Sequence, residues 1–272
     1  MSYQKPENLI FVPLSWTLPQ AEYGGYTSCS GRGRGLTDQN LVEGTSLVLT
    51  DRHVCLRSKS TRMSAIDDKK PWWQEKTFEF SGHTLKMAMF KESSLGVSAY
   101  VWEPGVELCQ YFHNEKVNFA GKKILELGSG TGIVGILAVL LGGDVTLTDR
   151  PRVLKQIEYN VAANIPSHSR HRAKVGTLVW GDDQFNYSTD FEVILGSDIV
   201  YSPIHFPALV KTLLHFCSVN TVIYLSSNLN ARMGAENFHK EVLPKLFNCE
   251  LVHSNKGNCI YKVTKECTDN AD

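Results

Sequence analysis

Glu126-Leu127-Gly128-Ser129-Gly130-Thr131-Gly132 begins at the end of the short, mainly apolar run 123–127 and precedes the longer apolar run 133–141. The first run has the length and composition of a buried strand, and the second those of a buried helix. Glycines between a strand and a helix let the backbone turn sharply and let a ligand approach the main chain. The stretch therefore predicts a strand–loop–helix unit with a ligand site at the carboxyl end of its strand.

The spacing of these glycines separates two classes of cofactor. A dinucleotide site of the pattern Gly-x-Gly-x-x-Gly would need a glycine at position 133, which is Ile133 here. Gly128, Gly130 and Gly132, with Glu126 before them, match instead the pattern of S-adenosylmethionine sites. Glu126 can face the cationic end of that cofactor directly or through water. A tight turn without a ligand is the alternative for a glycine motif by itself.

Asp149 ends the next expected strand, 144–148. A carboxylate at this place can accept hydrogen bonds from both hydroxyls of a ribose. The alternative is an N-cap for the helix that begins at Pro151, which is worth ~1 kcal/mol. The glycine loop and this acid together predict a nucleoside-binding site.

Strands and helices alternate around this unit. Further strands are expected at 173–180, 191–196 and 221–226, helices at 151–164, 203–217 and 235–247, and a closing hairpin at 250–254 and 259–263. This succession predicts a mostly parallel sheet with helices on both faces and one antiparallel strand at an edge. Upstream, alternation in 77–80 and 85–89 predicts a hairpin around Ser81-Gly82, and 100–112 predicts a helix.

A second motif, Ser197-Asp198-Ile199-Val200-Tyr201, follows the fourth strand, whose end should lie beside the transferred methyl group. A lysine ammonium has an unperturbed pKa of about 10.4 and has no lone pair until it loses a proton. Asp198 can orient the amine and help its proton leave, while Tyr201 can wall the pocket and hold the aliphatic stem. The alternative role for Asp198 is a helix cap.

Two tryptophans are candidate walls of the cofactor pocket. Trp102 stands at the start of the helix expected at 100–112, and Trp180 ends the third strand. Either indole can lie against a purine ring, and ordinary core packing is the alternative.

Composition excludes several classes of function. The 272-residue chain has 28 basic and 28 acidic residues, so no overall charge attracts nucleic acid or an anionic membrane. Its cysteines form no Cys-x-x-Cys pair, which favours reduced thiols in a cytoplasmic protein and no metal site. Residues 1–75, with the run Gly31-Arg32-Gly33-Arg34-Gly35, predict an irregular, flexible extension before a domain at 76–265 and a tail at 266–272.

Taken together, the motifs resemble the seven-β-strand protein-lysine methyltransferases of the methyltransferase family 16 type, in particular the branch that modifies chaperones, valosin-containing protein and translation elongation factors. The resemblance covers roughly residues 77–265 and rests on Tyr100-Val101-Trp102, Glu126 to Gly132, Thr148-Asp149, Val179-Trp180-Gly181 and Ser197 to Tyr201. It implies a Rossmann-like sheet of strand order 3-2-1-4-5-7-6. It also implies cofactor contacts from Trp102, Gly128, Ser129, Gly130, Asp149, Trp180 and Ser197, and contacts to the lysine from Asp198 and Tyr201.

The resemblance further implies an S-adenosylmethionine-dependent enzyme that acts on a protein, with elongation factor 1-alpha or a chaperone as the candidate substrate. We expect a cytoplasmic monomer that binds neither membrane nor nucleic acid. Residues 1–75 have no counterpart in the family, and the loop 228–232 is less basic than the matching region of its members.

Three other functions stay open at this stage. Methyltransferases of nucleic-acid amino groups carry Asn or Asp followed by two prolines, where this sequence has Ile199-Val200. A non-catalytic scaffold would tolerate loss of Asp149 or of the glycines, which are present. A nicotinamide-dependent oxidoreductase is disfavoured by Ile133.

Overall fold

The computed structural model describes residues 73–230 and 234–265. The first strand already begins at Trp73, slightly before the predicted boundary at 76. The predicted tail, and all of the predicted extension before that strand, lie outside the described residues.

Seven strands form the central sheet in the order β5-β4-β3-β6-β7-β9-β8. Their bounds are β3 (Lys123–Leu127), β4 (Asp144–Asp149), β5 (Ala173–Thr177), β6 (Val193–Ser197), β7 (Val222–Asn228), β8 (Asn248–Asn255) and β9 (Asn258–Thr264). Counted from β3, this is the predicted order 3-2-1-4-5-7-6. Strands β3 to β7 pair in parallel, whereas β9 is antiparallel to both of its neighbours, β7 and β8.

The expectation of an antiparallel strand at the sheet edge was therefore wrong by one position. The closing hairpin folds back so that its second strand, β9, pairs with β7, and its first strand, β8, becomes the edge.

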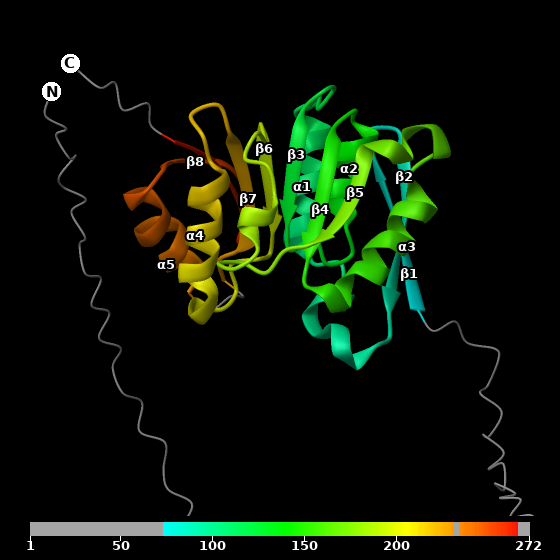
Figure 1. The fold of residues 1–272 in the computed structure, drawn as a ribbon, viewed down its shortest axis with the longest axis horizontal. Coiled ribbons are helices and arrows are strands. Elements are labelled where there is room, and N and C mark those ends of the chain that lie inside the picture. The colour runs from blue at the N-terminus through cyan, green and yellow to red at the C-terminus, as the bar shows by residue number, and fades with distance from the viewer. Residues whose placement is uncertain (1–72, 231–233, 266–272) are drawn as a thin grey trace, which may run out of the picture. The chain divides into compact units, whose positions relative to one another are not determined.

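The helices cover the two faces of this sheet (Figure 1). They are α1 (Glu103–Asn114), α2 (Ile133–Leu140), α3 (Leu154–Asn164), α4 (Phe206–Phe216) and the short α5 (Ala235–Asn237). Alternation along the central strands assigns side chains to each face. Ile124 of β3 packs into a core with α1, α2 and α3, while Leu125 and Leu127 pack on the opposite face with α4 and α5.

The predicted upstream hairpin is present as β1 (Trp73–Phe80) and β2 (His83–Phe90), which pair only with each other. Its turn has positive φ at both Ser81 and Gly82, the geometry that matches the twist of a two-residue hairpin. Beta-strand β2 lies against α3 (Figure 1, cyan beside green). An unpredicted irregular segment, η1 (Ser93–Ala99), links this hairpin to α1.

Several predicted elements end earlier or start later than expected. The helix expected at 100–112 begins at Glu103, because Trp102 is still extended and Pro104 occupies the first turn. The third strand ends at Thr177 rather than Trp180. The helix expected at 235–247 is broken into α5, a π turn at Phe238–Val242 and a 3₁₀ turn at Leu243–Lys245. Pro244 accounts for the break, because it has no N–H and its ring clashes with the preceding turn.

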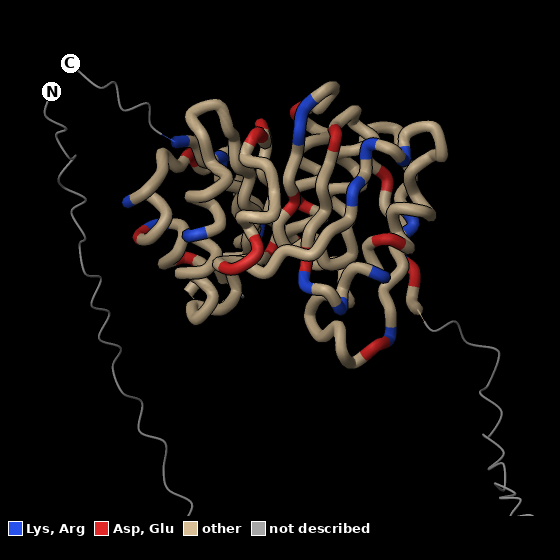
Figure 2. The backbone as a smooth tube through the Cα atoms, in the orientation of Figure 1, with Lys and Arg blue, Asp and Glu red and all other residues tan. Residues whose placement is uncertain are grey.

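Acidic and basic residues are interspersed along the described backbone (Figure 2), in keeping with the balanced composition. Within the described ranges, every helix is too short or too polar to cross a bilayer. The same ranges contain no group of three or more His, Cys, Asp or Glu side chains arranged to hold a metal ion.

Candidate functional site

A cavity of about 200 Å³ opens at the carboxyl ends of β3, β4 and β6, the edge where the sequence predicts a ligand. Strand pairing brings these ends together, since Leu127 of β3 is opposite Thr148 of β4 and Glu126 is opposite Leu195 of β6. The wall is completed by the loop after β5 and by the segment between η1 and α1. Nine of the ten residues predicted for the site line this cavity: Trp102, Gly128, Ser129, Gly130, Asp149, Trp180, Ser197, Asp198 and Tyr201.

The glycine loop passes under the cavity in a conformation that side chains disfavour. Gly128 and Gly130 both have positive φ. A Cβ on Gly128 would lie 2.9 Å from Ile199 and 3.1 Å from the ring of Trp180. A Cβ on Gly130 would come within 3.5 Å of the Ser98 carbonyl oxygen and fill the space between the two. The absent side chains therefore keep the cavity open.

Glu126 does not line the cavity. Its side chain is buried behind the loop, 1% exposed, against Gly135 of α2. Burial raises the pKa of Glu126 to about 8, so this carboxyl is largely protonated at neutral pH. Its predicted role opposite a cationic cofactor stays a prediction, and the structure places its carboxyl between the loop and Gly135 of α2.

Asp149 ends β4 at the cavity, and its carboxylate organises the glycine loop. One oxygen accepts the N–H of Gly130 at 2.9 Å, and the other accepts the N–H of Arg150 at 2.7 Å. Burial raises the pKa of Asp149, and these two N–H groups and the Arg150 charge act in the opposite direction. Each carboxylate oxygen keeps a second lone pair, so two hydroxyl groups in the cavity can still be bound.

Neither Asp149 nor Asp198 caps a helix, which was the alternative role for each of them. The turn after Asp149 has Arg150 at its N-cap, and the turn after Asp198 has Ser202 there, both without a side-chain cap bond. Asp198 is instead a buried residue with a φ of 53°, a left-handed conformation that non-glycine residues rarely adopt. Its N–H donates to the Ser226 carbonyl of β7 at 2.8 Å. Backbone strain of this kind clusters at functional sites.

Both tryptophans wall the cavity. Trp102 remains 38% exposed, which argues against simple core packing, and its indole N–H donates to the Val97 carbonyl at 2.8 Å. Trp180 is half-buried and packs at the edge of the second core. Tyr100, in the first resemblance motif but outside the predicted site, also lines the cavity and contacts the Trp102 ring edge-on.

Sequence reasoning missed Val97, Ser98 and His205, which also line the cavity. The first two lie in η1, where Gly96 interrupts the helical geometry, so that no periodic pattern marks the segment. His205 follows Pro203 in a short 3₁₀ turn. A single histidine outside any motif does not indicate a binding site.

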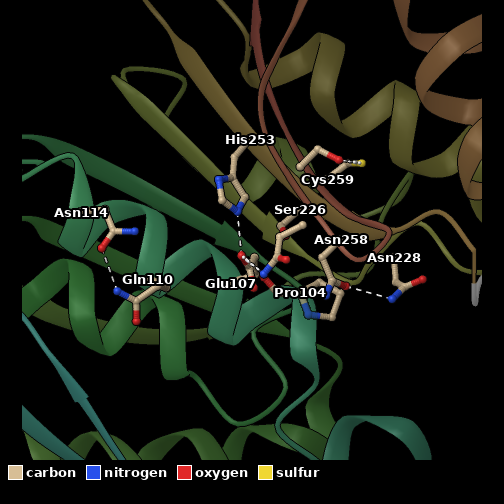
Figure 3. A network of polar contacts seen from close by, with 11 residues as sticks. Pro104, Glu107, Gln110, Asn114, Ser226, Asn228, His253, Asn258 and Cys259 are labelled. Atoms are coloured by element: carbon tan, nitrogen blue, oxygen red, sulfur yellow. Dashed lines mark hydrogen bonds and ion pairs between the residues drawn. The ribbon is translucent and has the colours of Figure 1, made fainter.

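The first turns of α1, beside Trp102 and Gly105 of the cavity wall, make polar contacts with β7 and with β8 of the C-terminal hairpin (Figure 3). The Ser226 hydroxyl of β7 donates to the Pro104 carbonyl at 2.8 Å. Glu107 lies 2.6 Å from His253 Nε2 and accepts the Asn255 amide at 3.1 Å. These contacts hold α1 against β7 and the C-terminal hairpin.

The sequence of this chain matches proteins of known function. A family model described as "Lysine methyltransferase" matches residues 81–243. EEF1A lysine methyltransferase 3 of Mus musculus is 49% identical over 64% of this chain and 74% of its own length. The Xenopus tropicalis protein of the same name is 44% identical over 71% of this chain and 86% of its own length. Protein N-lysine methyltransferase METTL21A of Mus musculus is 38% identical over 70% and 87%.

One solved structure supports the fold alone. A 16S rRNA methyltransferase of T. thermophilus, solved with AdoMet and guanosine, superposes with a TM-score of 0.52 at 15% identity. The match covers 72% of this chain and 52% of that protein.

Proposed function

This chain belongs to the lysine methyltransferase family, and on that premise we propose that it methylates a lysine side chain of translation elongation factor 1-alpha. The family confirms the predicted enzyme class, a protein-lysine methyltransferase that uses S-adenosylmethionine. Two of the relatives described above are named for EEF1A, and both share more identity with this chain than METTL21A does. The substrate assignment is supported by these names and by the chemistry of the site.

The residues around the cavity fit S-adenosylmethionine. The glycine loop leaves the space that a Cβ on Gly128 or Gly130 would occupy. Asp149 offers spare lone pairs to a ribose, and Trp180 offers a flat apolar surface for a purine. Gly105 and Ser197 also line the cavity, side by side. A Cβ on Gly105 would lie 3.2 Å from the Ser197 hydroxyl oxygen, so the glycine leaves room for a close approach of the two segments.

When bound, this cofactor supplies a methyl group on a positively charged sulfur. The chain's own residues then bring a lysine amine to it in line. Asp198 is buried and its backbone is fixed by the hydrogen bond to Ser226, so its carboxylate is presented at one place in the cavity, where it can orient the amine and help it release a proton. Tyr201, which also lines the cavity, holds the aliphatic stem of the lysine, and partial desolvation there favours the neutral amine that has a lone pair. Positioning contributes most of the rate advantage.

The observation that carries this proposal is the convergence of the predicted residues from three strand ends on one cavity. The test incubates the full chain with purified elongation factor 1-alpha and methyl-labelled S-adenosylmethionine, and locates the label by mass spectrometry. We expect label on a lysine of the factor, and none with the Asp198→Asn variant. Label on a chaperone or on RNA, with none on the factor, would reject the substrate proposed here.

Cofactor binding provides an independent test. A ligand at about 100 times its dissociation constant stabilises the folded state by about 2.7 kcal/mol. S-adenosylmethionine should therefore raise the melting temperature of this chain, and nicotinamide dinucleotides should leave it unchanged. A rise with the dinucleotides alone would contradict the cofactor assignment.

We further infer a cytoplasmic location and a monomeric state. Cys109, Cys217, Cys249 and Cys259 are free thiols, as expected in a reducing compartment, and translation factors act in the cytoplasm. Fluorescence microscopy of the tagged chain and light scattering of the purified chain test these two points. A nuclear signal or a dimer mass would contradict them.

A further inference from the structure

Three amide side chains on α3 line up at a spacing of four residues, Gln156, Asn160 and Asn164, and all three bind the backbone of β2. Their carbonyl oxygens accept the N–H groups of Phe90, Ala88 and Lys86 at 2.9, 2.8 and 2.7 Å. The amide groups of Asn160 and Asn164 return donors to the Ala88 and Lys86 carbonyls at 3.0 Å. We call this set the amide ladder.

The ladder has a plain structural role. Strand β2 pairs with β1 on one edge, which leaves a row of backbone groups on the other edge without a strand partner. Amide side chains satisfy those groups as a neighbouring strand would. Gln156 and Asn160 are fully buried, so their polar groups need such partners.

The three members of the ladder differ in what else they bind. The Gln156 amide donates to the Ser98 carbonyl at 2.7 Å and to the Gly130 carbonyl at 3.2 Å. The Asn160 amide donates to the Thr131 carbonyl at 2.9 Å. All three acceptors belong to residues that line the cavity. The Asn164 amide donates instead to the Asn160 carbonyl at 2.8 Å, within its own helix.

Gln156 therefore joins two walls of the cavity that come from distant parts of the chain. Gly130 is held from both sides, with its N–H on Asp149 and its carbonyl on Gln156. Ser98 lies in η1, which Gly96 kinks. Two side-chain donors hold η1 in place, Gln156 on Ser98 and Trp102 on Val97. A single buried amide thus bridges η1 and the glycine loop directly.

We propose that Gln156 is a positioning residue for cofactor binding, that Asn160 contributes less, and that Asn164 only docks the β1–β2 hairpin. This inference rests on the proposed function, since it takes the cavity to be the S-adenosylmethionine site. Cofactor affinity should follow the number of cavity carbonyls that each amide holds.

The test compares Gln156→Met with Asn164→Leu in the full chain. Each substitution replaces one amide of the ladder by an apolar side chain of similar size. Both variants should melt at a lower temperature than the parent. The dissociation constant for S-adenosylmethionine, measured by calorimetry, should rise about tenfold for Gln156→Met, the effect of losing one ordinary hydrogen bond, and less than about twofold for Asn164→Leu. The KM for the cofactor should rise with little change in kcat.

A second variant serves if Gln156→Met does not fold. Gln156→Glu keeps the acceptor for the Phe90 N–H and loses a donor toward Ser98 and Gly130, so it should also bind the cofactor weakly. A measurement on the parent chain avoids substitution altogether. Cofactor should slow hydrogen exchange at the Phe90 amide, which Gln156 binds, more than at the Lys86 amide, which Asn164 binds.

Equal affinity in the Gln156 variants and the parent, or equal losses in the Gln156 and Asn164 variants, would overturn the inference. Equal protection at Phe90 and Lys86 would do the same. A parent chain that does not bind S-adenosylmethionine would give a different result, because it would reject the proposed cofactor itself and this inference with it.

Discussion

The left-handed backbone at Asp198 can be tested by replacing this residue with alanine and with glycine. Both substitutions remove the carboxylate and all of its contacts, and both leave the Asp198 N–H bond to the Ser226 carbonyl in place. They differ in the Cβ, which alanine keeps at a φ of 53° and glycine lacks. The difference in stability between the two variants therefore isolates the backbone strain at the site.

The size of this difference follows from two opposing effects. The left-handed conformation destabilises a residue that has a Cβ by about 1–2 kcal/mol. Glycine has more conformational freedom than alanine in the unfolded chain, and this destabilises the folded glycine variant by about 0.5–1 kcal/mol relative to the alanine variant. The glycine variant should be the more stable by about 0.5–1 kcal/mol, or about 2 °C in melting temperature for a domain of this size.

Differential scanning calorimetry of the two variants and the parent measures this difference, and a methyl-transfer assay on the same samples measures function. Both variants should bind S-adenosylmethionine with nearly the affinity of the parent and transfer no methyl group. An alanine variant more stable than the glycine variant by about 0.5–1 kcal/mol, the difference in freedom of the unfolded chain alone, would show that the backbone is not strained. Normal turnover by either variant would show that the carboxylate has no role in transfer.

Four further predictions concern single side chains. Asp149→Ala removes the acceptor of the Gly130 N–H and should weaken cofactor affinity at least about tenfold in calorimetry. Gly135→Ala places a Cβ 2.4 Å from Glu126 and 2.7 Å from Leu147, so urea unfolding should show a loss of about 1–3 kcal/mol. Burial raises the pKa of Glu126 from 4.5 to about 8, so the folded state keeps a proton that the unfolded state releases, and the free energy of unfolding should fall across that pH range. Glu126→Gln should flatten this fall. Burial lowers the pKa of His239 from 6.5 to about 3, so stability should decline as pH falls through that range, and His239→Gln should reduce the decline.

The central sheet could be predicted because its signals are local. The strand 123–127 has the bounds of β3, and the glycines after it have the positive φ that their placement implied. Two acids and a tryptophan at or just beyond strand ends meet in one cavity, because parallel strands present their carboxyl ends at the same edge: Asp149, Asp198 and Trp180. Strand order came from the resemblance, since no pattern within a strand specifies which neighbour it pairs with.

The remaining features depend on contacts between distant segments. The apolar periodicity of 151–164 places Val153, Leu154, Ile157 and Val161 on one face, and the structure buries all of these except Leu154, which is half-buried. Periodicity of apolar residues gave no reason to bury Gln156 and Asn160 as well, because their burial depends on the unpaired edge of β2. Likewise, the close approach of the Glu126 carboxyl to Gly135 of α2 could not be predicted from its sequence position, because it depends on how α2 packs on β3.

The two ends of the cavity are held by different kinds of structure, and this difference follows from what each end must do. Asp198 is fixed by main-chain bonding to β7, a central strand whose position the whole sheet determines. Such a rigid seat suits a carboxylate that must keep its orientation while an amine approaches. At the other end, η1 only has to flank the cofactor. It is held there by two side-chain donors, at Ser98 and Val97, together with the burial of Leu95 and Ala99 in the core. The position of this wall therefore depends on side chains, so a single substitution such as Gln156→Met can shift it without disturbing the central sheet.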